Sequence, residues 1–231
     1  MNRIRNILRY FTPWEWSLWC VSVLLVGLSG IFFRESGGVS TLASLIGVTS
    51  LIFNAKGNPI GPLLMIVFSI FYGIISYSCA YYGEMITYLG MSLPMAVVAL
   101  AAWLRHPSEA GKSEVRINRI RGREYALLAL LSAAVTVLFY FILAYFGTAQ
   151  LTASTLSVTT SFAAAYLTAR RSPYFALCYA ANDAVLIVLW VLASLADPSY
   201  LSVTVCFAVF LVNDLYSFVN WRRMEKRQSG M

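Results

Sequence analysis

Long apolar runs alternate with short polar segments along the whole chain. A run of about 20 apolar residues is long enough for a helix to cross the hydrocarbon core of a bilayer. Eight such segments can be marked, and the second and sixth are short and rich in Ser and Thr; they are 14–33, 41–55, 62–82, 84–104, 126–146, 151–168, 174–195 and 200–221. The pattern therefore predicts an all-α integral membrane protein with eight transmembrane helices.

The composition supports this prediction. The 231 residues are 59% hydrophobic and only 12% charged, with a mean hydropathy of +0.71, whereas a soluble domain carries about 25% charged residues. The net charge of +7 does not indicate a nucleic-acid partner, because the basic residues stand in the short connecting segments. If the N-terminus is cytoplasmic, all of the 17 basic residues except Arg34 fall on the cytoplasmic side. We therefore expect a multi-pass protein of the inner (plasma) membrane with both termini cytoplasmic.

Several classes of chemistry are disfavoured by what the sequence lacks. His106 is the single histidine and stands in a basic loop, so a histidine metal site or a catalytic triad is not expected. The four cysteines stand in apolar runs without CxxC spacing, and no Walker A or GxGxxG motif is present. The sequence thus predicts no metal, no cofactor and no enzymatic activity. Three arginines precede the first apolar run as in a signal peptide, but the length of that run predicts a retained helix.

The order of the segments suggests an internal repeat. Trp103 and Trp221 stand 118 positions apart, and each ends a set of three apolar segments at a basic sequence. Two three-helix units with the same orientation need one helix between them, and segment 126–146 supplies it. We predict one extra N-terminal helix followed by a 3+1+3 parallel repeat. The expected boundaries are 1–38 (N-terminal segment and extra helix), 39–105 (first bundle), 106–148 (loop and linker helix), 149–222 (second bundle) and 223–231 (cytoplasmic tail).

Two connecting features carry more than one interpretation. If the loop after the first unit is helical, Arg116, Arg119 and Arg123 share one face, which would suit anionic lipid or a partner. The same residues are also what a loop on the positive inside of a membrane requires. Pro94, inside the fourth apolar segment, removes a backbone hydrogen bond and is either a hinge or a static kink.

Polar residues interrupt the last two apolar segments. The dipeptide Asn-Asp occurs at 182–183 and again at 213–214, and a carboxylate in hydrocarbon is costly and usually functional. Asn213, Tyr216 and Asn220 are spaced three to four apart and share a helix face. We expect this face to lie opposite Asp183 and Trp190 and to form a central polar cavity. Asn side chains also serve as contacts between membrane helices, and Trp190 can equally be a packing residue.

The C-terminal third of the sequence resembles a known family. Arg-Arg-x-Pro at 170–173, Asn182-Asp183, Leu189-Trp190 and the run from Phe210 to Trp221 look like the nicotinamide riboside transporters called PnuC. The resemblance implies a fold related to the SWEET sugar transporters, uptake of nicotinamide riboside by facilitated diffusion, and a trimer. Ala164 departs from the family at a position often held by Gln, which removes one expected substrate contact.

The residues suit such a substrate, a flat pyridinium cation with a carboxamide and a ribose. Trp190 can stack on the ring, asparagine amides can donate and accept, and an aspartate can offset the charge. The candidate substrate-binding residues are Asn182, Asp183, Trp190, Asn213, Asp214, Tyr216, Asn220, Tyr72 and Thr159. The alternatives are a SWEET-like sugar or other nucleoside carrier, proton coupling through either aspartate, and a membrane-embedded enzyme that uses the two aspartates.

Overall fold

The structure is a computed structural model that describes residues 10–32, 38–78, 82–109, 113–148, 150–195 and 197–230. It confirms a helix at each of the predicted apolar segments to within a few residues, except at the C-terminal end of the last one. The helices are α2 (Pro13–Phe32), α3 (Gly38–Ala55), α4 (Ile60–Ser78), α5 (Tyr82–Ile86), α6 (Leu93–Arg105), α7 (Gly122–Tyr145), α8 (Leu151–Ala169), α9 (Phe175–Ser194) and α10 (Leu201–Ser229), with the π-helical η1 (Thr87–Ser92) joining α5 to α6 and the 3-10 turn η2 (Pro198–Tyr200) before α10.

Most of these helices are suited to a bilayer. Within the described ranges, six helical stretches are long and apolar enough to cross a membrane: α2, α4, the continuous α5–η1–α6, α7, α9 and α10. The remaining two predicted spans, α3 and α8, are the Ser- and Thr-rich segments. Many large apolar side chains are exposed on the outer surface of the bundle, as expected where lipid replaces water.

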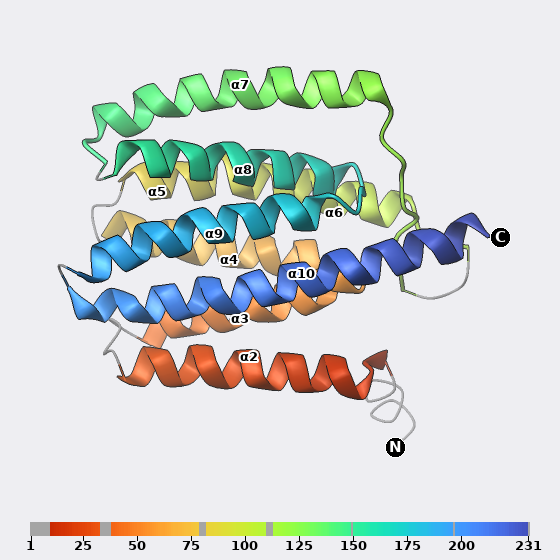
Figure 1. The fold of residues 1–231 in the computed structure, drawn as a ribbon, viewed down its shortest axis with the longest axis horizontal. Helices are drawn as coiled ribbons and strands as arrows, with labels where there is room; N and C mark the ends of the chain where they lie inside the picture. The colour runs from red at the N-terminus through yellow and green to blue at the C-terminus, as the bar shows by residue number, and fades with distance from the viewer. Residues whose placement is uncertain are drawn as a thin grey trace.

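The helices run side by side (Figure 1), and contacts between neighbours close six of them into a ring. Around the ring, α3 packs on α4, α4 on α6, α6 on α8, α8 on α9, α9 on α10, and α10 back on α3. Two helices lie outside it. The α2 helix packs against α3 and α10, and α7 packs against α8 at the opposite side of the molecule.

The described basic segments gather at one end of the bundle, at the right in Figure 1, where α2 begins and α10 ends. Ion pairs link neighbouring elements there. Lys56 contacts Glu15 at 3.1 Å, Arg170 contacts Glu124 at 2.7 Å, and Arg227 contacts Glu114 at 3.3 Å. This basic end is therefore a single layer of charge at one end of an apolar bundle.

The connection before α7 is extended, so the predicted helical face of Arg116, Arg119 and Arg123 is wrong. The backbone N–H of Val115 donates to Gly57 O at 2.9 Å, and the N–H of Asn118 donates to Arg171 O at 3.1 Å. These bonds take up backbone groups that a helix would have used internally. The loop thus joins the turn after α3 to the turn after α8.

The C-terminal end of α10 also differs from the prediction. The helix does not end at Trp221 but continues to Ser229, through most of the expected tail. Gln228 explains part of this extension, because its side chain accepts from Ile117 N at 2.8 Å and donates to Val115 O at 3.1 Å. The helix continues because its last turns are hydrogen-bonded to the backbone of the loop before α7.

Pro94 follows a π-helical stretch. The segment Thr87–Ser92 is wound as a π-helix, and α6 begins directly after it with Pro94 in its first turn. The helix is continuous through this point, so Pro94 removes one backbone hydrogen bond to the preceding π-helical turn. Short π-helical stretches are frequent at functional sites, and this one lies beside the cavity described below.

Two tryptophans tie the ring together near its basic end. The Nε1–H of Trp103 in α6 donates to Thr168 O in α8, and that of Trp221 in α10 donates to Asn54 O in α3, both at 2.8 Å. The two rings also contact each other, with centroids 5.4 Å apart. Both side chains are fully buried. Each bond joins the last helix of one predicted unit to the first helix of the other.

Candidate substrate cavity

A cavity of about 90 Å³ lies inside the ring. Every ring helix contributes to its wall, which is the arrangement that a central site needs. The lining residues are Leu51, Asn54, Pro62, Met65, Phe68, Tyr88, Ser92, Met95, Ala96, Ala99, Ser161, Ala165, Thr168, Tyr179, Asn182, Asp183, Leu186, Phe207, Phe210 and Asp214. The space is large enough for several water molecules.

One stripe of α9 supplies much of the polar wall. Tyr179, Asn182, Asp183 and Leu186 are three to four residues apart and therefore share a face. The Oδ1 atom of Asn182 accepts hydrogen bonds from Ser157 at 2.9 Å and from Thr160 at 3.0 Å, both on α8. These bonds fix the orientation of the amide, so its NH₂ group is the part that remains for a ligand.

The two aspartates meet at the cavity wall. Asp183 on α9 and Asp214 on α10 are each 3% exposed, and their carboxyl groups are in hydrogen-bonding contact. The Oδ2 atom of Asp183 has no hydrogen-bond partner among the described residues. A buried acceptor without a partner is costly, so this atom is a natural contact for a donor or a positive charge on a ligand.

The charge of the wall has one sign. Among the described residues that line the cavity there are two carboxyl groups and no Lys, Arg or His. Aromatic rings from Phe68, Tyr88 and Tyr179 complete the wall. Such a site suits a cationic or uncharged flat molecule and offers no partner for a phosphate.

Asn213 does not line the cavity. Its amide donates to Ser22 Oγ on α2 at 3.0 Å and to Val209 O at 2.8 Å, and it is 2% exposed. Successive residues of a helix are about 100° apart, so Asp214 turns inward where Asn213 turns outward. The expectation that the face of Asn213, Tyr216 and Asn220 lies opposite α9 is wrong, because this face packs on α2 and α3.

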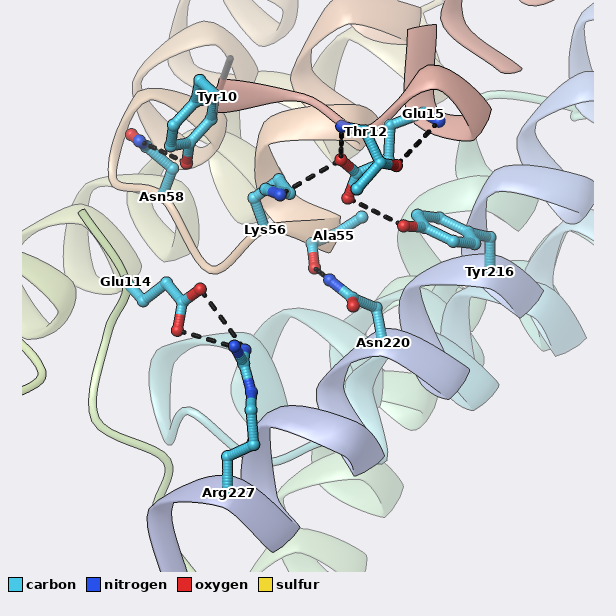
Figure 2. A network of polar contacts seen from close by, with 10 residues as sticks. All are labelled: Tyr10, Thr12, Glu15, Ala55, Lys56, Asn58, Glu114, Tyr216, Asn220 and Arg227. Carbon is cyan, nitrogen blue, oxygen red and sulfur yellow. Dashed lines mark hydrogen bonds and ion pairs between the residues drawn. The ribbon is translucent and has the colours of Figure 1, made fainter. Parts of the chain in front are cut away.

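Figure 2 shows where the other two residues of that face are bound. The hydroxyl of Tyr216 donates to Glu15 Oε1 at 2.8 Å, and the amide of Asn220 donates to Ala55 O at 2.8 Å. Glu15 is itself 1% exposed and accepts from Thr12 N at 2.7 Å in a capping box at the start of α2. These contacts hold α2 and the end of α3 against α10.

Three further candidates lie away from the main cavity. Trp190 packs on Tyr200, with ring centroids 5.4 Å apart. Thr159 shares a 2.7 Å hydrogen bond with Thr136 on α7. The rings of Tyr72 and Tyr88 are in tilted contact, with their centroids 4.5 Å apart, and Tyr72 lines a smaller neighbouring cavity of about 20 Å³. Substrate contact by these residues stays a prediction.

Several wall residues were not among the candidates from sequence. Asn54 and Tyr88 come from the first unit, and Ser161 and Thr168 come from α8. Ser161, Ala165 and Thr168 carry a helical three-to-four spacing that would have marked a face of α8. Nothing local distinguishes Asn54 or Tyr88, because which faces of α3 and η1 point inward depends on how the helices pack.

The chain is similar to known membrane transporters. Residues 38–223 match the family model described as nicotinamide mononucleotide transporter. The chain belongs to this family. The resemblance seen in the C-terminal third is thereby confirmed over most of the chain, while α2 lies outside the matched range.

Two relatives of the nicotinamide mononucleotide transporter family support the assignment. The chain is 25% identical over 230 residues to the nicotinamide riboside transporter PnuC of Neisseria mucosa, covering 98% of this chain and 87% of the relative. Its fold matches the crystal structure of the vitamin B3 transporter PnuC with a TM-score of 0.80 over 94% of each chain, at 22% identity. The chain is therefore an all-α, multi-pass membrane transporter and not an enzyme.

Proposed function

We propose that this chain carries nicotinamide riboside across the membrane by facilitated diffusion, with the cavity inside the ring as the substrate site. The observation that carries the proposal is the cavity wall, in which Asn182, Asp183 and Asp214 stand among aromatic rings. An amide pairs with the carboxamide or the ribose hydroxyls, and a carboxyl group offsets the pyridinium charge. The name of the relative from Neisseria mucosa points to the same substrate.

The riboside is a better substrate than the mononucleotide on electrostatic grounds. The mononucleotide adds a phosphate, and anions of this kind are bound in proteins by Arg, Lys or backbone N–H groups. The described cavity wall has no basic side chain and has two carboxyl groups. The phosphate would therefore lose its hydration without gaining a partner.

The proposed transport cycle rocks two three-helix units about the cavity. The first unit is α3, α4 and α5–α6, the second is α8, α9 and α10, and α7 joins them. The reciprocal bonds of Trp103 and Trp221 support this division, because each crosses between the units at the basic end.

We further propose eight spans, with both termini on the cytoplasmic side of the inner (plasma) membrane. Gathering of the described basic segments at one end of the bundle supports this orientation. A trimer is proposed from the family resemblance alone. Labelling of single cysteines introduced at each end tests the orientation, and mass measurement of the detergent-solubilised protein tests the trimer.

A fluorescence titration tests the substrate. Nicotinamide riboside, its mononucleotide, nicotinamide and glucose are titrated separately while tryptophan emission is recorded. We expect quenching by the riboside at the lowest concentration and none by the mononucleotide or glucose in the same range. Binding of glucose but not of the riboside would support the alternative SWEET-like sugar carrier instead.

Substitutions at two adjacent residues, Asp214 and Asn213, distinguish a cavity residue from a residue that packs against another helix. Asp214→Ala removes one carboxyl group of the cavity wall and should weaken binding of the riboside about tenfold, as for a lost hydrogen bond to a charged group. Asn213→Ala removes the bond to Ser22 and should lower thermal stability, with affinity little changed. The opposite pattern would restore Asn213 as the ligand and place the site on the face toward α2.

Uptake into liposomes tests the energetics. Facilitated diffusion predicts that labelled riboside enters until the concentrations inside and outside are equal. An imposed pH gradient should not drive accumulation. Accumulation that follows the pH gradient would instead show proton coupling through the aspartates.

A further inference from the structure

We propose that Asp183 and Asp214 hold one proton between them, so that the pair presents a single negative charge matched to a singly charged cation. This inference rests on the proposed function, and it names how the same site selects its substrate. The pair would then act as a charge selector that prefers the pyridinium form of the ring over an uncharged ring of the same shape.

The contact between the two carboxyl groups is the first step. An ionised carboxylate can only accept hydrogen bonds, so two carboxyl groups form one only when a proton lies on one of them. Asp183 and Asp214 line the same cavity wall, with their carboxyl groups close enough together for such a bond, and both are buried. Two unshared negative charges at this distance in a buried site would repel strongly.

The surroundings offer no other source of compensation. The other titratable groups that face the pair are Tyr179 on its own helix α9 and Tyr88 on η1, and both carry neutral hydroxyls at physiological pH. Among the described residues of the wall, none from α3, α4, α6 or α8 is ionisable. Glu84 of α5 lies near Tyr88 but not in the wall, so the carboxyl groups of the wall itself are this pair.

The neighbouring asparagines explain why the two aspartates point at each other. Asn182 is bound to Ser157 and Thr160 on α8, and Asn213 is bound to Ser22 on α2. In each Asn-Asp dipeptide the amide anchors the helix to a neighbour and the aspartate lines the cavity; Asn182 lines the cavity as well, whereas Asn213 does not. The same combination of an anchored asparagine and a cavity-lining aspartate therefore occurs once on α9 and once on α10.

One oxygen of the pair remains available for a ligand. The Oδ2 atom of Asp183 is buried and has no hydrogen-bond partner in the described part of the chain. With the proton held in the contact between the carboxyls, this atom bears part of the remaining negative charge. It is the atom that we expect nearest to the pyridinium ring or its carboxamide NH₂.

The test compares two rings that differ in charge. Nicotinamide riboside is a cation, and its 1,4-dihydro form is uncharged but keeps the carboxamide and the ribose. Binding of both is measured for the wild type, Asp183→Asn, Asp214→Asn and the double variant. Glu124→Gln is the control, since it removes a carboxyl that does not line the cavity and breaks only a partly exposed ion pair.

The expected result is a preference that survives either single substitution and disappears with both. In the wild type the cation should bind roughly 100-fold tighter than the uncharged form, as for unit charges about 6 Å apart at an effective dielectric constant near 20. Each single variant keeps one carboxylate and should stay within about tenfold of this ratio. The double variant should bind both forms equally, and retained affinity for the uncharged form shows that it is folded.

Three outcomes would overturn the inference and leave the proposed function standing. If either single variant loses the preference as fully as the double variant, the two carboxyls do not share one charge. If the double variant keeps the preference, the counter-charge lies elsewhere. If riboside binding to the wild type in weak buffer releases a proton, the empty pair holds two. A wild type that binds neither ring form refutes the proposed function itself, and this inference with it.

Discussion

The two halves of the chain share a scaffold, and they differ in the chemistry that they bring to the cavity. The half from α2 to α6 and the half from α7 to α10 each place an outer helix first and a buried tryptophan last. Trp103 and Trp221 make the same kind of bond to the opposite half. Lys56 pairs with Glu15 of α2, and Arg170 pairs with Glu124 of α7, at corresponding turns.

The backbone of those turns corresponds as well. Gly57 and Arg171 both have positive φ, at 64° and 58°, and each carbonyl accepts a bond from the same loop. The likeness extends to the outer helices, because α2 covers the boundary of α3 with α10 and α7 covers the boundary of α8 with η1 and α6. The extra N-terminal helix is therefore the counterpart of the linker helix.

The cavity wall lacks this likeness. Asp214 of α10 corresponds to Ala96 of α6, which lines the same cavity at the same offset as the tryptophans. When the halves are aligned on the turns at Gly57 and Arg171, the positions that match Asn182 and Asp183 of α9 are Phe68 and Ser69 of α4. A repeat can thus keep its packing contacts while one copy takes over polar recognition and the other supplies the hydrophobic wall.

Replacing the tryptophans gives the largest test of the shared scaffold. Trp103→Ala and Trp221→Ala should each lower the free energy of unfolding by about 3–5 kcal/mol, because a fully buried ring leaves a void. Thermal unfolding in detergent measures both. If one substitution leaves the free energy of unfolding nearly unchanged, the two tryptophans are not equivalent and the two halves do not share this part of the scaffold.

The two ion pairs should differ although their positions correspond. Glu15→Gln leaves Lys56 without its partner at a buried site, and we expect a loss of about 3 kcal/mol. Glu124→Gln breaks a half-exposed pair and should cost about 1 kcal/mol or less. Chemical denaturation of both variants gives the difference. Equal losses would mean that burial does not set the strength of these pairs.

The turn residues provide the smallest test. Gly57→Ala should destabilise by about 1–2 kcal/mol, since a side chain disfavours positive φ, and its Cβ would also lie 2.8 Å from Met224 Cε. Arg171→Gly relieves the same backbone conformation and should be neutral or stabilising by up to about 1 kcal/mol. A stabilising Gly57→Ala would show that this turn adopts another conformation in solution.

Much of the fold could be predicted from the sequence, because apolar runs and basic loops report the solvent that each segment meets. The helices appear where hydropathy placed them, and the two tryptophans make matching bonds in the two halves. What failed were the two places where another element supplies the partner. The loop with Arg116 is extended because the turns after α3 and α8 bind it, and α10 is long because that loop binds Gln228.

The candidate site was predicted only in part, for a related reason. Spacing shows which residues share a helix face, and it placed Asn213, Tyr216 and Asn220 together correctly. Spacing cannot show which element that face packs against, and in the structure Asn213 and Tyr216 bind residues of α2. Asp214, one residue along, points to the cavity. In a polytopic protein a polar face marks a neighbour, and that neighbour is either a ligand or another helix.

The loop between the halves has a mechanical consequence. Val115 is bound to the turn after α3 and Asn118 to the turn after α8, and only three residues of extended chain, about 10–11 Å, can span that interval. As long as both bonds hold, the loop acts as a strap of limited length between the turn after α3 and the turn after α8. It limits how far these two turns can separate at the basic end, whatever happens at the other end of the molecule.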